Sequence, residues 1–411
     1  MRVALIDPSL FTLPYDRALA GGLTRAGHRV TLYGRRPGPE DGDPGGVELV
    51  PAFYGVAGGR RVAALPRPLR LGIKGVDHAV SMARLLRRLR AERPDVIHFQ
   101  WLPLPLVDGA MLPRFAALAP LVLTVHDTDP FNGDPSAGVQ QRGFSRCLGA
   151  FDALIVHTAQ GRARLLARGV PDGKLVVLPH GPLVEVPPPP PDPMRGPLTL
   201  VLFGKIKPYK GADVLIEAFA RLPDALRAQA RLRVVGKPYM DLAPLRELAR
   251  SRGVLDRLTI EPRFVGDAEM AEVFAPGSVA VFPYREIEAS GVLSLALAHG
   301  RPVVASRLGN FAEAVEDGVQ GRLVPPGDAA ALCSALADLI GDRGFAASCA
   351  ACARMLAERT PGWDEIARRT TEAYAAAGAR AASAGRTRPD ARAPETAGAA
   401  PGASARAGAA R

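Results

Sequence analysis

The chain lacks the features that mark membrane-spanning and nucleic-acid-binding proteins. Its longest largely apolar stretch, 102–125, is interrupted by Asp108, Arg114 and several prolines, so it falls short of the roughly 18 apolar residues of a membrane span. Only 6% of the residues are aromatic, and the arginines are not interleaved with aromatic residues at regular spacing. Because single-stranded nucleic acids stack on such aromatic residues, we do not expect nucleic acid as a partner.

Cysteine is also scarce, and its pattern argues against a metal or redox site. Cys349 and Cys352 form a C-x-x-C motif inside an alanine-rich helical stretch, with no second pair and no histidine nearby. We therefore expect this pair, Cys147 and Cys333 to be buried, reduced thiols. No metal site is expected elsewhere.

The formal net charge of +11 is partly a property of the last residues. In the segment 378–411, six arginines outnumber Asp390 and Glu395, which gives this segment a charge of +4. The segment is rich in Ala, Gly, Pro and Arg without periodicity, so we expect a disordered tail. At the other end, "MRVALIDPSL" enters a strand directly, which predicts cytoplasmic synthesis without secretion.

The rest of the chain predicts an α/β fold. Short β-branched runs such as "RVALID", "PLVLTVHD", "TLVLFGK" and "SVAVFPY" alternate with amphipathic stretches, which is typical of parallel sheets with crossover helices. The polyproline stretch "VEVPPPPPDPMRG" interrupts this alternation, because neither a helix nor a central strand continues through it. We expect two doubly wound domains that face each other across a cleft. The predicted organisation is a first domain at 1–183, a linker at 184–197, a second domain at 198–360, a helix at 361–377 that could cross back to the first domain, and a tail at 378–411.

Ligands of such sheets bind at the carboxyl ends of the strands, which selects the loops after "VLFG", "TVHD" and "VFPY". In the first loop, Lys205, Lys207 and Lys210 follow Gly204 and precede a helix. Lysines and free helix-start amides can stabilise a departing nucleoside diphosphate without a metal. A solvated lysine turn would have the same sequence.

The other two loops offer histidine, carboxylate and amide groups. After "VFPY", Ser290 and Gly291 begin a helix, and Glu286 and Glu288 stand just before it. These carboxylates could accept hydrogen bonds from sugar hydroxyls, or be ordinary acids at a helix start. In "TVHD", His126 could face the cleft and touch a substrate hydroxyl, or be structural.

Taken together, three segments resemble a known family. "FGKIKPYKGADVLIEAFA", "EASGVLSLALAHGRPVVASRLGNFAEAVEDGVQGRLVPPGD" and "TVHD" are similar to the retaining GT-B glycosyltransferases of glycosyltransferase family four, the nucleotide-sugar-dependent "group 1" type. The likeness spans residues 1–375. It implies a GT-B fold of two Rossmann-like domains and a reaction without a cofactor other than the nucleotide-sugar co-substrate.

The resemblance also implies roles for single residues. Lys205 and Lys210 match the positions that hold the leaving diphosphate, with Lys205 in place of the usual Arg. His126 matches a histidine that lies against the donor sugar, and Arg263 matches a region whose backbone meets the nucleobase. The implied catalytic residues are His126, Lys205, Lys210 and Glu288, and the implied donor-binding residues are Gly204, Arg263, Glu286, Ser290, Gly291 and Val292.

One departure from the family concerns its second glutamate. Counting back from Gly300 puts the two family positions at Ile287 and Leu295, and counting forward from Glu288 puts the second at Ala296. Neither count finds a second carboxylate. Ribose recognition must then come from elsewhere or be weaker, at a cost of about 1–3 kcal/mol.

The resemblance implies retention of configuration, in which the leaving phosphate accepts the proton of the acceptor hydroxyl and no protein nucleophile is needed. Two D-x-D triplets, 41–43 and 127–129, could hold a metal-bound diphosphate. The first lies in a Pro/Gly-rich loop and the second in the wrong domain for donor phosphates. A metal-independent reaction is therefore expected.

The acceptor should meet the first domain. The loop "DPSLFTLPYDR" follows the first strand, and its candidates for acceptor binding are Ser9, Thr12 and Tyr15. An arginine-rich segment, 59–94, could hold an anionic membrane for a lipid-linked acceptor at the inner face, or be a basic surface helix packed on its sheet. Its predicted apolar face consists of Val76, Val80, Ala83 and Leu86.

The leading hypothesis is a glycosyltransferase of polysaccharide or glycolipid and cell-envelope synthesis, with a glycan or lipid-linked acceptor. A nucleotide-sugar epimerase on the same fold is an alternative that would need no acceptor. A binding protein that has lost turnover is another, favoured by the missing glutamate and opposed by the retained lysines.

Overall fold

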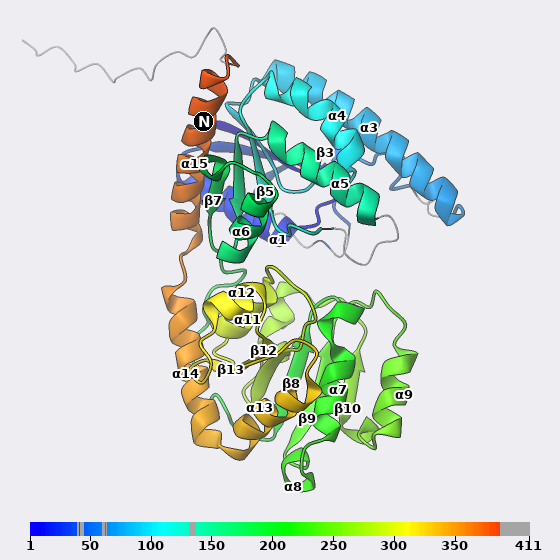
Figure 1. Ribbon diagram of the computed structural model, residues 1–411, viewed down its shortest axis with the longest axis vertical. Helices are drawn as coiled ribbons and strands as arrows, with labels where there is room; N and C mark the ends of the chain where they lie inside the picture. Colours follow the sequence, from blue (N-terminus) through cyan, green and yellow to red (C-terminus); the bar gives the residue numbers. More distant parts are fainter. Residues whose placement is uncertain (39–40, 42–44, 60–61, 63, 131–136, 387–411) are drawn as a thin grey trace, which may run out of the picture.

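The computed structural model describes residues 1–386 except 39–40, 42–44, 60–61, 63 and 131–136. This part of the chain forms two α/β domains stacked along the long axis of the molecule (Figure 1). Each domain is a parallel sheet covered by helices, so the alternation of strands and helices predicted from the sequence is confirmed.

The first domain contains a seven-stranded sheet with the order β3-β2-β1-β4-β5-β6-β7, and all neighbouring strands are parallel. Its buried strands are rich in Val, Ile and Leu, as expected for sheets with both faces covered. The strands are β1 (Arg2–Asp7), β2 (Arg29–Arg35), β3 (Glu48–Phe53), β4 (Val96–Phe99), β5 (Leu121–Val125), β6 (Ala153–Val156) and β7 (Leu175–Val177); the helices are α1 (Leu13–Arg25), α3 (Arg67–Glu92), α4 (Pro105–Ala116), α5 (Ala137–Cys147) and α6 (Ala159–Ala167).

The second domain contains a six-stranded parallel sheet with the order β10-β9-β8-β11-β12-β13. Its strands are β8 (Leu198–Phe203), β9 (Ala230–Val235), β10 (Leu258–Glu261), β11 (Ser278–Phe282), β12 (Val303–Ser306) and β13 (Gly321–Val324). Its helices are α7 (Ala212–Ala220), α8 (Asp224–Arg227), α9 (Ala243–Ser251), α10 (Met270–Val273), α11 (Val292–Ala298), α12 (Gly309–Ala314), α13 (Ala329–Gly341) and α14 (Arg343–Arg359).

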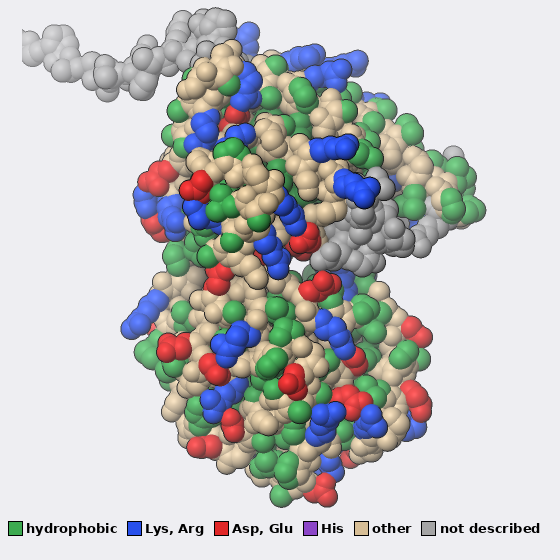
Figure 2. All heavy atoms as spheres, viewed as in Figure 1, with side chains coloured by type: hydrophobic (Ala, Val, Ile, Leu, Met, Phe, Trp, Pro, Cys, Tyr) green, Lys and Arg blue, Asp and Glu red, His purple; other side chains and the backbone are tan. Residues whose placement is uncertain are grey.

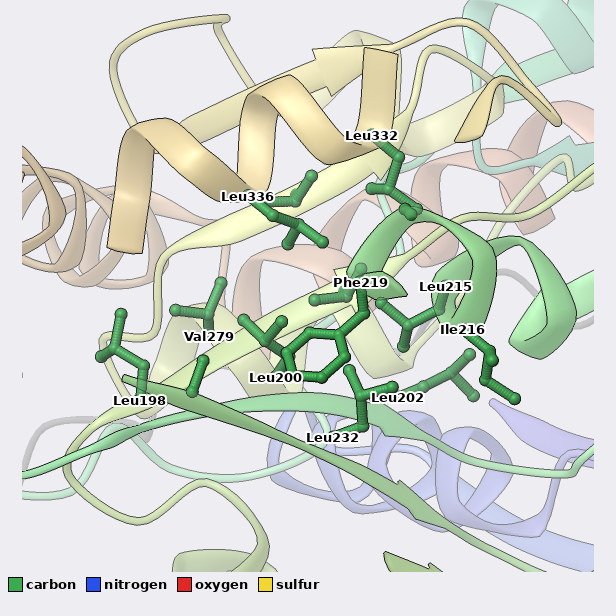
Figure 3. Close-up of a cluster of buried hydrophobic side chains, with 14 of the residues drawn as sticks. Leu198, Leu200, Leu202, Leu215, Ile216, Phe219, Leu232, Val279, Leu332 and Leu336 are labelled. Atoms are coloured by element: carbon green, nitrogen blue, oxygen red, sulfur yellow. The ribbon is translucent and has the colours of Figure 1, made fainter. Parts of the chain in front are cut away.

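Apolar side chains fill both faces of each sheet. On one face of the second sheet, alternate residues of β8 point at α7 and α13, where Phe219 and Leu336 are fully buried (Figure 3). This follows from the two-residue period of a strand, which sends every second side chain to the same face. Large buried apolar areas of this kind give each domain its own core.

The last helix connects the domains. α15 (Trp363–Ser383) follows α14 and packs on α1, so Tyr374 lies in the core of the first domain (Figure 1). Arg380 donates from Nε to the Asp152 backbone oxygen at 2.6 Å, and Arg386 donates to the Asp152 carboxylate. The helix continues past residue 377 to Ser383. The prediction of a disordered tail that starts at 378 is therefore wrong for residues 378–383. Residues 387–411 lie outside the described residues.

One prediction of burial and one prediction of a shared helix face need correction. Cys333 and Cys352 are only partly buried, because α13 and α14 cover the sheet from outside and the margins of their packed faces stay accessible. In α3, Leu86 is 4% exposed and packs on the sheet, whereas Val76 is 68% exposed. The two residues therefore lie on different faces of α3. Leu86 lies on the buried face with His78, Met82 and Leu89, and Val76 lies on the exposed face.

Candidate active site

The cleft between the domains lies at the carboxyl ends of both sheets. Strand order reverses between β1 and β4 in the first sheet and between β8 and β11 in the second, and ligands of open α/β sheets bind at such points. Two adjoining cavities of about 610 and 500 Å³ open there, and both are lined by loops of both domains. They meet at Phe11 and Lys207, which line both. Figure 2 shows the waist between the two lobes.

The loop after β8 brings a lysine ammonium group against the backbone. Gly204 has a φ of +111°, and a Cβ at this position would lie 2.7 Å from Lys210 Nζ. Gly211, with a φ of +69°, lies so close to the loop after β11 that a Cβ would be 2.0 Å from the Pro283 oxygen. Glycine at both positions therefore allows the lysine turn and the loop after β11 to lie in contact.

Positive charge concentrates in this turn without carboxylate partners. Lys210 is only 6% exposed, and burial together with Lys205 and Lys207 lowers its pKa to about 7. Burial and Lys207 also lower the pKa of Lys205. In the described part of the chain neither Lys205 nor Lys210 forms an ion pair, and their ammonium groups lie 4.0 and 4.9 Å from the ring centroids of Phe11 and Tyr284. The turn is therefore suited to bind an anion.

The start of α11 lies at the 500 Å³ cavity, beside the loop after β8. The Ser290 amide donates to Asn310 Oδ1 at 3.0 Å, and Asn310 Nδ2 donates to the Ser290 oxygen at 3.2 Å. Gly291 lines the 500 Å³ cavity, and Val292 lies beside Gly204. The structure thus brings these predicted donor-binding residues next to the lysine turn.

The two glutamates before α11 have different surroundings. Glu286 is exposed and lines the 500 Å³ cavity. Glu288 is 2% exposed, and its Oε2 accepts hydrogen bonds from the Thr128 amide at 3.0 Å, from the Thr128 hydroxyl and from Arg164 Nη1 at 3.4 Å. Burial raises the pKa of Glu288. Its carboxylate therefore links the second domain to the first.

A second carboxylate strengthens this link. Glu313 of α12 accepts hydrogen bonds from the amides of Ala159 and Gln160, both at 2.9 Å. These amides open α6, where the helix dipole favours negative charge. Glu288 and Glu313 together hold α6 of the first domain against the second domain.

His126 is half-buried and contacts two buried side chains. Its Nδ1 lies 3.1 Å from His157 Nε2, and its Nε2 lies 3.1 Å from Gln100. His157 Nδ1 donates to the Leu178 oxygen at 3.0 Å, so His157 Nε2 must accept the proton of His126 Nδ1. Both rings remain neutral when the Gln100 amide turns its NH₂ group to His126 Nε2. His126 also lines the 500 Å³ cavity. Its hydrogen bonds therefore hold a neutral imidazole in a fixed orientation at the cleft.

These histidines should make the stability of the protein depend on pH. Burial lowers the pKa of His98 and of His157 to about 3, and it lowers the pKa of His126 well below its usual value. The unfolded chain takes up protons near pH 6.5 while the folded chain does not, so the free energy of unfolding should decrease as the pH falls below about 6.5. Each histidine contributes up to about 1.4 kcal/mol per pH unit. In urea unfolding at pH 7, 6 and 5, we expect His157→Gln to show a shallower loss than the wild type; an equal slope would contradict this prediction.

The three predicted acceptor residues lie at different depths. Ser9 lines the 610 Å³ cavity and Thr12 the 500 Å³ cavity. Tyr15 is 3% exposed, and its ring packs against His126, His157 and Trp363 at centroid distances of 4.8 to 5.2 Å. Direct contact of Tyr15 with an acceptor is thus a wrong prediction, because α1 turns its ring into the core of the domain.

The remaining predicted groups are placed as follows. Arg263 lines the 610 Å³ cavity and donates to Glu269 at 2.6 Å. Asp41 pairs with Arg35, and Asp43 lies outside the described residues. Asp129 pairs with Arg168 at 2.6 Å. Among the described residues no cluster of three His, Cys, Asp or Glu side chains has metal-binding geometry.

Sequence reasoning missed several groups that line the cleft. His157 and His180 follow β6 and β7, and the rule that selected His126 at the end of β5 would have selected them too. Phe11 and Trp101 follow β1 and β4 in the same way. Lys237, after β9, lines the 610 Å³ cavity beside Lys205.

Comparisons with known proteins agree with this geometry. Residues 17–182 match the family model described as Glycosyltransferase Family 4, and residues 197–342 match the model described as Glycosyl transferases group 1. The D-inositol 3-phosphate glycosyltransferase of Xylanimonas cellulosilytica is 35% identical over 179 residues, which are 43% of this chain and 42% of that protein. The one of Streptomyces coelicolor is 31% identical over 296 residues, 63% of this chain and 64% of that protein. The chain thus matches less than two thirds of the length of these curated relatives.

Solved structures extend the likeness to both domains. HepE of Anabaena, in complex with UDP and glucose, superposes with a TM-score of 0.70 at 19% identity over 91% of this chain and 99% of that chain. Sucrose-phosphate synthase of Thermosynechococcus elongatus gives a TM-score of 0.71 at 22% identity over 91% and 98%. These similarities confirm the predicted GT-B fold. The chain therefore contains a Glycosyltransferase Family 4 domain at 17–182 and a Glycosyl transferases group 1 domain at 197–342.

Proposed function

We propose that this protein transfers a sugar from a nucleotide diphosphate donor to an acceptor hydroxyl with retention of configuration. The observation that carries the proposal is the lysine turn, in which Lys205 lines the 610 Å³ cavity and Lys210 is buried against Gly204. Neither lysine forms an ion pair in the described part of the chain. A leaving diphosphate gathers negative charge as its bond to the sugar breaks. Fixed, desolvated cations stabilise that charge without reorganising at the moment of reaction.

The two cavities suit the two parts of such a donor. The 610 Å³ cavity, lined by Lys205, Lys237 and Arg263, would hold the nucleotide, and the 500 Å³ cavity beside His126 and Glu286 would hold the sugar. Both volumes lie in the usual range for small-molecule sites, about 300–1,000 Å³. The complex of HepE with UDP-glucose supports a nucleotide sugar as the donor.

In the proposed reaction, the bond between the anomeric carbon and the diphosphate oxygen breaks while the acceptor oxygen bonds to that carbon from the same face. The acceptor proton passes to the leaving diphosphate, so the atoms balance without a protein nucleophile. Lys210 and Lys205 hold the diphosphate, and the neutral His126 can touch a sugar hydroxyl. Because lysines supply the positive charge at the diphosphate, we propose that the reaction needs no metal.

Incubation with a panel of nucleotide sugars and mass spectrometry of released nucleotide tests this proposal. We expect release from at least one donor, unchanged by EDTA, and a product with the anomeric configuration of the donor. Conversion of the donor sugar without an acceptor would identify an epimerase instead. Nucleotide binding without release would identify a binding protein, and absence of both would contradict any nucleotide-sugar function.

We further propose a glycan or lipid-linked acceptor of polysaccharide or cell-envelope synthesis, met at the inner face of the membrane. None of the described helices combines the length and apolar character needed to cross a bilayer. The helix α3, however, lies on the outside of the first domain (Figure 1). It exposes Val76, Val80, Arg84 and Arg87. Their spacing of four, four and three residues puts them on one helical stripe, apolar and then basic, which suits an anionic leaflet.

Replacing both Val76 and Val80 by glutamate should weaken binding to vesicles that contain anionic phosphatidylglycerol. Burial of a valine side chain contributes about 1.5 kcal/mol, so the expected loss in a sedimentation assay is at least tenfold. Replacing Met355, which is exposed on α14 of the other domain, by glutamate should leave binding unchanged. Equal binding of the wild type to neutral and anionic vesicles would contradict the membrane contact.

A further inference from the structure

Two aromatic rings stand where the strand order of the first sheet reverses. Phe11 follows β1 and Trp101 follows β4, and their rings stack with centroids 4.9 Å apart and 29° between the planes. Phe11 is 46% exposed, and both rings line the 500 Å³ cavity. Neither ring belongs to the core clusters of the domain, so packing of the fold does not account for them.

The turn that carries Phe11 is held by hydrogen bonds to Asp7 and Asp16. Asp7 accepts hydrogen bonds from the Ser9 amide at 3.1 Å and from the Thr12 amide at 2.9 Å. The Thr12 hydroxyl also contacts the buried Asp16 at 3.2 Å. Leu10, next to Phe11, has a φ of +51°, a conformation that leucine adopts only where its surroundings impose it. The backbone that carries the Phe11 ring is thus held in one conformation, which reduces the entropy lost on binding.

Polar groups surround this apolar plane. Asp127 lines the same cavity, and one of its oxygens accepts the Asp129 amide at 2.8 Å. A pyranose ring has C–H groups on its faces and hydroxyls on its rim, so it needs a flat apolar surface with hydrogen-bond acceptors beside it. A lipid alcohol would need a continuous apolar groove, but the cavity is also lined by His126, Asp127, Asp129, Arg164, Arg285 and Glu286.

The aromatic pair also lies next to the lysine turn. Lys205 Nζ is 4.0 Å from the centroid of the Phe11 ring, so a sugar ring stacked beside Phe11 would have its rim close to a diphosphate held by Lys205. Transfer requires the two reacting atoms to approach within about 3–3.5 Å. The position of the pair therefore fits an acceptor better than a distant regulatory ligand.

We propose that Phe11 and Trp101 form the acceptor platform of this enzyme, on which the acceptor binds through a pyranose ring whose hydroxyls face Asp127. The acceptor is then a carbohydrate. This proposal rests on the proposed function and adds the chemical class of the acceptor and the residues that select it.

Tryptophan fluorescence tests the platform without requiring turnover. The chain has two tryptophans, Trp101 and Trp363. Trp363 lies at the start of α15, away from the 500 Å³ cavity, and its Nε1 donates to the Pro182 oxygen at 2.6 Å. In the Trp363→Phe variant with saturating UDP, Trp101 is the sole reporter. Titration with methyl glucoside, galactoside and mannoside should give a saturable change with at least one of them, whereas 1-hexanol should give none. Phe11→Ala in this background should weaken that binding about tenfold or more, because the apolar surface that the sugar ring covers is lost.

Kinetics separate this proposal from the proposed function. Phe11→Ala and Trp101→Ala should raise the KM for the methyl glycoside about tenfold, a larger effect than any change in acceptor-free donor hydrolysis, and Trp101→Phe should retain most of the wild-type affinity. Leu106→Ala, an exposed position on α4, serves as the control and should change neither value. Failure of hydrolysis in every variant and the wild type would contradict the proposed function, not the platform. The platform is wrong if no glycoside changes Trp101 emission, if 1-hexanol does, or if Phe11→Ala impairs only hydrolysis.

Discussion

Replacing Lys210 by alanine is expected to lower kcat/KM for the nucleotide sugar by about 10²–10³-fold, because a buried cation that stabilises developing charge is lost. Lys210 Nζ lies against Gly204 at the end of β8, and no other cation occupies that position among the described residues. Nucleotide affinity should fall by about 10- to 100-fold, the usual value of a charged hydrogen bond. Steady-state kinetics and calorimetry with UDP would measure both effects.

Matched variants make this prediction specific. Lys210→Arg should fail as well, because Lys210 is buried and a larger head group would not fit, whereas Lys205→Arg should retain activity through bidentate contacts to phosphate. Lys174→Met removes a lysine that donates to two backbone oxygens at the opposite end of the first sheet, and it should lower stability only. Wild-type UDP affinity should decrease as the pH rises above 7, where Lys210 loses its proton, and the alanine variant should lack this dependence. Unchanged turnover of a folded Lys210→Ala protein would refute the role of the turn.

Replacing Glu288 by alanine should have the second large effect, on stability and activity together. The substitution leaves the buried Thr128 amide and hydroxyl and the Arg164 guanidinium without their carboxylate. Leaving the buried Thr128 donors without an acceptor costs about 1–3 kcal/mol, whereas the half-exposed Arg164 stays solvated. Because Thr128 follows His126 and Asp127 directly, the loop that lines the cleft should shift, and transfer should be lost. Urea unfolding and kinetics of the same sample measure both losses.

The neighbouring glutamate is the control. Glu286→Ala should leave the free energy of unfolding within about 0.5 kcal/mol of the wild type, as for most exposed positions, and should change only donor or acceptor kinetics. A double-mutant cycle of Glu288→Gln with Thr128→Val should show coupling between the two domains. If Glu288→Ala lowers kcat without any loss of stability, Glu288 acts on the substrate and not as a link between domains.

Local sequence patterns sufficed for most of the fold. The period-two and helical patterns predicted β1, β8, β11 and α13, since these elements bury a continuous apolar face. β3 and β13 were not predicted. β3 is mostly accessible and contains Pro51, and β13 begins at Gly321, whose φ of +149° is set by contact with the Val303 oxygen. Such edge strands depend on the neighbouring strand more than on their own residues.

The sequence predicted which loops form the candidate site, but not how all of their side chains are oriented. The rule on strand ends located Gly204, Lys205, Lys210 and His126, because that rule depends only on the direction of parallel strands. It could not tell that Tyr15 turns inward, since α1 carries apolar residues and Tyr15 on the same buried face. Phe11 and Trp101 lie 90 residues apart, and no local pattern relates two such loops.

The sequence by itself determined two alternating α/β domains, the lysine turn after β8 and the absence of a second glutamate, because each of these is a property of a short segment. Only the tertiary structure decided that Glu288 faces Thr128 and Arg164, that Lys210 is buried, and that Phe11 stacks on Trp101. Burial and pairing depend on which loops the two sheets bring together, and contacts between distant residues have no signal within either segment.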